Sequence, residues 1–251
     1  MSITYRQLTP EAIIDLALNA GLSAIEWGGD LHVPHGDLVS AKRVGERTRA
    51  NGLVCGSYGS YYRLGEQALI DGAADRVIET AVALGAPAVR VWAGARGSAE
   101  TSDTERSRIV EDGRHFVLQA ETRGVRVVVE YHASTLTDTA ASATRLRDEI
   151  GHPALTLGWQ PPNRFSDEQR VADLQSVLEA VTDVHVFNWR MKDGKIERRA
   201  LAEAQDSWRS CLRLLREDGR DHHLMLEFVP EDNPAALEPE AATLLDLMNS
   251  A

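Results

Sequence analysis

Residues 125–132 of the chain read Val-Arg-Val-Val-Val-Glu-Tyr-His. The run is rich in β-branched residues and ends on a carboxylate and an imidazole. It is apolar on both faces, which is typical of a strand buried between a barrel interior and covering helices. Arg123-Gly124 stands just before it, which is typical of a helix that ends at a glycine and is followed by a strand. The segment therefore predicts a buried parallel strand.

The same pattern recurs along the whole chain. Short apolar runs alternate with segments of helical spacing, such as 10–19, where Thr9 is a suitable helix cap. The predicted strands are residues 3–6, 24–27, 54–57, 88–93, 125–131, 155–159, 184–188 and 223–228. Strand–helix alternation requires parallel pairing. We therefore predict an α/β fold, a single (β/α)8 TIM barrel that occupies residues 1–251 as one domain.

An open, doubly wound sheet is the competing architecture. That fold usually carries a glycine-rich turn after its first strand, but Arg6-Gln-Leu-Thr9 contains no glycine. The barrel is therefore favoured. In a barrel of this kind, functional side chains stand where the strands end and the following loops begin.

Composition narrows the class of protein. The formal net charge of -11 argues against nucleic-acid and anionic-membrane partners, because phosphate contacts need a surplus of lysine and arginine. Two cysteines, Cys55 and Cys211, are too few and too far apart for a disulfide framework. No signal peptide and no run of roughly 18 apolar residues is evident, so we expect a cytoplasmic protein.

Four successive strand ends carry residues that can bind a metal ion: Glu130, Gln160, His185 and Glu227. Neighbouring strands lie about 4.8 Å apart, so side chains from four strand ends can close around one ion. Carboxylate, imidazole and amide donors suit Mn²⁺, Mg²⁺, Co²⁺ or Zn²⁺. Glu130 and Glu227 each end an apolar strand, where a buried carboxylate needs an ion or a partner. Pairing of each glutamate with an arginine is the alternative to a metal or catalytic site.

The order and spacing of these motifs resemble the xylose isomerase-like barrel superfamily, which includes sugar isomerases and epimerases, inosose dehydratases and barrel-type apurinic endonucleases. The resemblance spans nearly the whole chain. It rests on Ala24-Ile-Glu-Trp27, Val89-Arg-Val-Trp-Ala-Gly94, Val129-Glu-Tyr-His132, Val184-His-Val186 and Leu226-Glu-Phe228. It implies one divalent metal ion held by Glu130, Gln160, His185 and Glu227, with Glu130 and Glu227 as catalytic acid and base.

The activity that the resemblance implies is a metal-dependent isomerase or epimerase that acts on a sugar or keto-polyol through an enediolate. A lyase such as a dehydratase would use the same chemistry, and a non-catalytic barrel subunit is the third alternative. Two departures from the family pattern matter. Gln160 stands where the family usually has Asp, and Phe187 and Asn188 stand where it often has Lys and Asp. These changes indicate an altered substrate, or weak or lost metal-dependent activity.

The expected partner is an unphosphorylated small molecule, since no glycine-rich phosphate cradle is evident. The candidate substrate contacts are His132, Arg190, Trp92, Asn163 and His32. The acidic net charge sets the apurinic-endonuclease branch aside. Related barrels are often dimers or tetramers, so the resemblance is compatible with a homo-oligomer.

Overall fold

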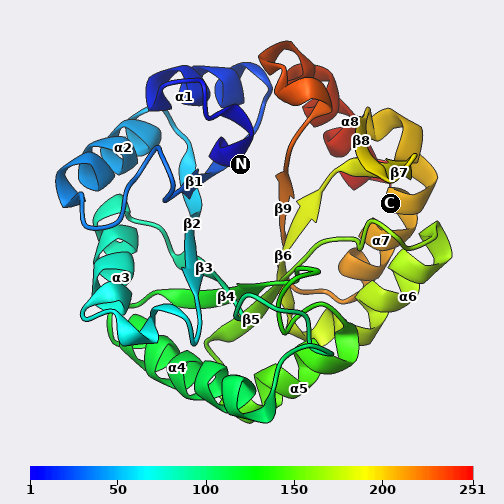
Figure 1. The fold of residues 1–251 in the computed structure, drawn as a ribbon. Coiled ribbons are helices and arrows are strands. Elements are labelled where there is room, and N and C mark those ends of the chain that lie inside the picture. Colours follow the sequence, from blue (N-terminus) through cyan, green and yellow to red (C-terminus); the bar gives the residue numbers. More distant parts are fainter. Residues whose placement is uncertain (251) are drawn as a thin grey trace.

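Strands and helices alternate around a central barrel in the computed structural model, which describes residues 1–250 (Figure 1). Seven parallel strands form one sheet in the order β1-β2-β3-β4-β5-β6-β9. They are β1 (Ala24–Gly28), β2 (Val54–Arg63), β3 (Ala88–Trp92), β4 (Arg126–Glu130), β5 (Leu155–Trp159), β6 (Val181–Val186) and β9 (His223–Leu226). The predicted barrel is therefore confirmed, although its sheet has seven strands where the sequence predicts eight.

Helices surround the strands in Figure 1. The described part of the chain has eight α-helices: α1 (Pro10–Asn19), α2 (Leu38–Ala50), α3 (Ala73–Leu84), α4 (Asp103–Thr122), α5 (Ala140–Ile150), α6 (Asp167–Val177), α7 (Gln205–Glu217) and α8 (Leu237–Ser250). The Thr9 side chain accepts a hydrogen bond from the Ala12 amide, so it caps α1 as the sequence predicts. Within residues 1–250, none of the helices combines the length and apolarity that a bilayer span requires.

The predicted first strand, residues 3–6, is wrong. The segment Ser2–Tyr5 is a short 3-10 helix, η1, which lies between β9 and β1. Its side-chain hydroxyls take the place of a strand ladder: Ser2 Oγ accepts from the Gly28 amide at 2.8 Å, and Thr4 Oγ1 accepts from the Phe228 amide at 2.9 Å. Because two hydroxyls satisfy these backbone groups, the gap between the outer strands closes without an eighth strand.

The predicted strand 184–188 is also wrong at its end. β6 stops at Val186, and the Phe187 carbonyl accepts a hydrogen bond from Trp208 Nε1 at 2.9 Å instead of continuing the sheet. The chain then forms an antiparallel hairpin, β7 (Asn188–Lys192) and β8 (Lys195–Arg199), which the sequence reading does not predict.

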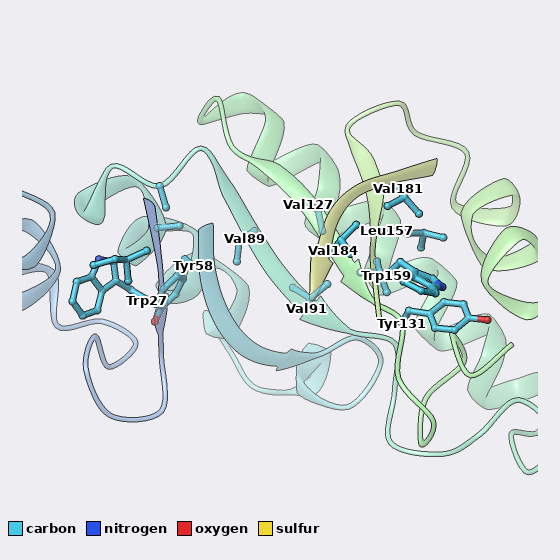
Figure 2. Packing of buried hydrophobic residues seen from close by; sticks show 14 of the residues in the cluster. Trp27, Tyr58, Val89, Val91, Val127, Tyr131, Leu157, Trp159, Val181 and Val184 are labelled. Carbon is cyan, nitrogen blue, oxygen red and sulfur yellow. The ribbon is translucent and has the colours of Figure 1, made fainter. Parts of the chain in front are cut away.

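Apolar side chains of the strands pack against the helices. In β3 and β4 the pairs Val89–Val127 and Val91–Val129 lie side by side and are buried, while Arg90 alternates with the valines of β3. Figure 2 shows Val89, Val91 and Val127 among the packed side chains. This alternation directs the valines to the helices and leaves Arg90 and Trp92 for the barrel interior. Cys55 and Cys211 are buried free thiols.

One ion pair at the N-terminal end of the strands predicts a pH-dependent stability. His223 Nδ1 lies 3.3 Å from Asp183 Oδ1, and this hydrogen bond outweighs partial burial, so the pKa of His223 is raised. A raised folded pKa stabilises the fold fully below the unfolded value of about 6.5, and the contribution is lost as the pH rises through the folded value. The free energy of unfolding lost in His223→Gln should therefore be larger at about pH 5.5 than at about pH 8.5 in urea titrations. Equal losses at both pH values would contradict this assignment.

Candidate active site

The main candidate site is a cavity of about 430 Å³ at the carboxyl ends of the strands. Its lining includes Arg90 and Trp92 of β3, Glu130 at the end of β4, Gln160 after β5 and Glu227 after β9. The carboxyl ends of the strands are where barrel enzymes carry their active sites. The size is within the range of small-molecule sites, about 300–1,000 Å³.

A buried arginine organises the base of this cavity. Arg90 Nη2 donates to Glu26 Oε1 at 2.9 Å, and Arg90 Nη1 donates to Glu130 Oε2. All three side chains are at most 4% exposed. Burial alone would raise the pKa of Glu26, but the Arg90 guanidinium and the Ser57 hydroxyl lower it to about 2. We call Glu26, Arg90 and Glu130 the arginine clamp.

The local structure of β2 makes room for the clamp. A side chain at Gly59 would place its Cβ 2.7 Å from Arg90 Nη2 and 2.8 Å from Glu26 Oε1, so only glycine fits there. Beyond Gly59 the register with β3 slips, because Gly59 pairs with Arg90 but Tyr62 pairs with Val91. Such a bulge re-aims side chains, and Tyr61, at a positive φ of 56°, lines the cavity.

The two carboxylates of the cavity have different surroundings. Glu130 accepts hydrogen bonds from Arg90 Nη1, from Trp92 Nε1 and, at 3.2 Å, from Gln160 Nε2. Among residues 1–250, the Glu227 carboxylate has one polar side-chain partner, His185, whose Nδ1 lies 3.4 Å from Glu227 Oε2. Glu130 is therefore held by several donors, while Glu227 keeps lone pairs free.

His185 and Glu227 influence each other's protonation. Burial disfavours the charged form of His185, but Glu227 outweighs it, so the pKa of His185 is raised. Burial likewise opposes ionisation of Glu227, but His185 and Arg90 keep its pKa below the usual value. The amino group of Met1 lies near these charges, and burial lowers its pKa. Glu227 is therefore kept ionised as a carboxylate.

The four predicted metal ligands belong to one connected network. Gln160 Oε1 lies 3.3 Å from His185 Nδ1, while the Gln160 amide nitrogen donates to Glu130 and to the Tyr131 carbonyl. His185 is fully buried, does not line the cavity, and has no partner at Nε2 within residues 1–250. In this part of the chain, no three His, Cys, Asp or Glu side chains converge as a metal-ligand group.

Three of the five predicted substrate contacts line the cavity. They are Trp92, His132 and Asn163, and the Trp92 and His132 rings stack at 4.7 Å. The other two lie elsewhere. Arg190 pairs with Asp167 at 3.1 Å outside the lining, and His32 is buried with its Nε2 3.2 Å from the Leu8 carbonyl.

Sequence reasoning missed Arg90 as a site residue, together with the aromatic wall made by Phe187, Trp189 and Phe228. A signal for Arg90 was present: it is the single charge in the apolar strand Ala88–Trp92, and a buried cation needs acidic partners. The wall had no comparable signal, because its residues are brought together by the unpredicted hairpin.

Comparison with known proteins supports the same fold. A curated relative, "3-dehydroshikimate dehydratase" of Bacillus anthracis, is 36% identical over 69 residues, which cover 28% of this chain and only 25% of that protein. A crystal structure from the same organism, described as a probable 3-DHS dehydratase, superposes with a TM-score of 0.80 at 20% identity and covers 97% of both chains. A barrel protein of Mycobacterium smegmatis in complex with magnesium gives a TM-score of 0.69 at 16% identity, over 98% of this chain and 90% of that one.

A family model covers most of the chain. The model described as "Xylose isomerase-like TIM barrel" matches residues 14–249, which include the clamp and all four predicted metal ligands. The motifs that carried the resemblance thus lie within the matched segment. The chain belongs to the xylose isomerase-like TIM barrel family.

Proposed function

We propose that this protein is an enzyme of the dehydratase type, a lyase. It removes a proton next to the carbonyl of a small hydroxylated keto compound and then expels a neighbouring hydroxyl as water. The observation that carries the proposal is the difference between the two cavity carboxylates: within residues 1–250, Glu130 is held by several donors, while Glu227 has only His185 as a side-chain partner. One free carboxylate suits a reaction that needs one base.

The chain's own residues supply the main steps. Glu227, kept ionised beside His185, takes the proton from carbon and can return it to the departing hydroxyl, so that water is lost. Arg90 holds the Glu130 carboxylate in a fixed position at the cavity base, so Glu130 meets the substrate without having to reorganise during the reaction. The similarity to a curated sequence and to a solved structure from Bacillus anthracis, both described as 3-DHS dehydratase, supports this reading.

We propose that the site holds a divalent metal ion. Three glutamates are buried there, Glu26, Glu130 and Glu227, but only Glu26 and Glu130 pair with the buried Arg90 guanidinium, and this excess of carboxylates favours a cation. Glu130, Gln160, His185 and Glu227 would hold it, and Gln160 would contribute its amide oxygen. When bound, such an ion acts as a Lewis acid on a carbonyl oxygen. The related barrel described with magnesium supports this assignment.

An isomerase or epimerase is the second candidate. It is favoured by the fact that Glu130 and Glu227 both line the cavity, one from β4 and one after β9, so two carboxylates could face a substrate. Epimerisation needs Glu130 to exchange a proton. The hydrogen bonds that Glu130 accepts from Arg90, Trp92 and Gln160 oppose this exchange. The products separate the candidates, since only a dehydratase removes the mass of water.

The role of Glu227 is tested with keto substrates in D₂O. Metal-supplied wild-type protein and Glu227→Gln are incubated with 3-dehydroshikimate and with D-fructose, and mass spectrometry follows deuterium uptake and loss of water. We expect loss of water by the wild type and a rate lower by at least about 100-fold in Glu227→Gln, because general-base catalysis contributes roughly that much.

The control is Glu168→Gln, an exposed change on α6 that should leave the rate unchanged. Full activity of Glu227→Gln would remove this residue from the mechanism. Deuterium uptake without loss of water would replace the dehydratase by the isomerase or epimerase.

Metal binding is tested through stability. Protein treated with a chelator should melt at a lower temperature than protein given Mn²⁺, by several degrees, because an ion that binds only the folded state stabilises it. Glu227→Gln should lose most of this shift, and Glu168→Gln should keep it. Identical melting curves with chelator and with Mn²⁺ would contradict a metal site at these residues.

A further inference from the structure

The cavity has two chemically different sides. Glu130, Gln160 and Glu227 form a polar base at the strand ends. Another part of the lining is apolar: Phe187, Trp189 and Met191, at the start of the hairpin, and Phe228, just after Glu227. We call Phe187, Trp189 and Phe228 the aromatic wall.

The aromatic wall offers carbon surfaces and few hydrogen bonds. Phe187 and Trp189 stack with centroids 4.1 Å apart, and Trp189 lies 5.6 Å from Phe228. The only donor of the Trp189 ring, Nε1, faces the Phe228 carbonyl at 3.4 Å. Arg198 lies 4.4 Å above the Phe228 ring and pairs with Asp232, which holds the wall in place.

The hairpin extends this apolar surface beyond the cavity. Met191 pairs with Ile196 across the antiparallel ladder, so both side chains lie on the face that Trp189 presents to the cavity. Each is 50% exposed. The tip thus carries two apolar side chains next to the cavity mouth, while Arg190 and Lys192 alternate onto the other face.

A free sugar would cover only part of this apolar surface. The C–H face of its ring can stack on the aromatic wall, but a sugar has no apolar group to cover Met191 and Ile196, which are each 50% exposed. We propose that the substrate is amphipathic, an inference that rests on the proposed function. Its hydroxylated keto part faces Glu130, Gln160 and Glu227, and a flat apolar or aromatic substituent stacks on the wall and extends to Met191 and Ile196.

The test compares the binding of two unreactive probes, methyl β-D-glucoside and phenyl β-D-glucoside, by isothermal titration calorimetry. They differ only in the substituent. We expect the phenyl compound to bind the wild type at least about tenfold more tightly, as stacking of one ring on an aromatic surface provides. In Met191→Ser/Ile196→Ser, this preference should fall by roughly threefold to tenfold.

The matched control is Val39→Ser/Ile70→Ser, which removes two exposed apolar side chains (81% and 53% exposed) that lie outside this cavity. It should keep the full preference for the phenyl compound. Equal affinities for the two probes, no binding of the phenyl compound, or an undiminished preference in Met191→Ser/Ile196→Ser would each overturn the inference. Because neither probe has a carbonyl, the outcome is independent of the proposed reaction: a failed dehydratase assay leaves it standing, and a failed binding test leaves the dehydratase standing.

Discussion

The arginine clamp is the constraint on which the rest of the site depends. Charged side chains are buried inside a barrel only if they are paired, and Arg90 pairs with Glu26 on one side and Glu130 on the other. The clamp joins the middle of β1 and of β3 to the carboxyl end of β4. It therefore fixes the carboxylate of Glu130 and also determines the charge that any ligand in the cavity meets.

The clamp gives the two glutamates of the cavity separate roles. Glu130 is committed to Arg90, Trp92 and Gln160, while Glu227 interacts with His185. The pair of catalytic acid and base that the family resemblance implies is therefore replaced in our proposal by one base, Glu227, and one fixed charge, Glu130. The backbone after Glu227 also carries strain, since Phe228 adopts a positive φ of 47°, which places its ring in the wall.

Much of the architecture could be predicted from local sequence. Valine-rich runs such as 125–131 identify buried parallel strands, and the residues at their ends identify Glu130, Gln160, His185 and Glu227 as neighbours. The errors came from tertiary context. Residues 2–5 look like a strand, but the hydroxyls of Ser2 and Thr4 satisfy the neighbouring backbone from a 3-10 helix. The hairpin, and with it the wall, depends on contacts such as Trp208 to Phe187 that no local pattern reveals.

A double-mutant cycle tests the clamp most directly. The free energies of unfolding are measured for the wild type, Glu26→Gln, Arg90→Met and the double variant. Arg90→Met alone should cost about 3–5 kcal/mol, because it leaves buried carboxylates without their partner. The double variant should cost at least about 2 kcal/mol less than the sum of the single changes. Costs that add to within about 0.5 kcal/mol would contradict the account, since Glu26 and Arg90 would then act independently.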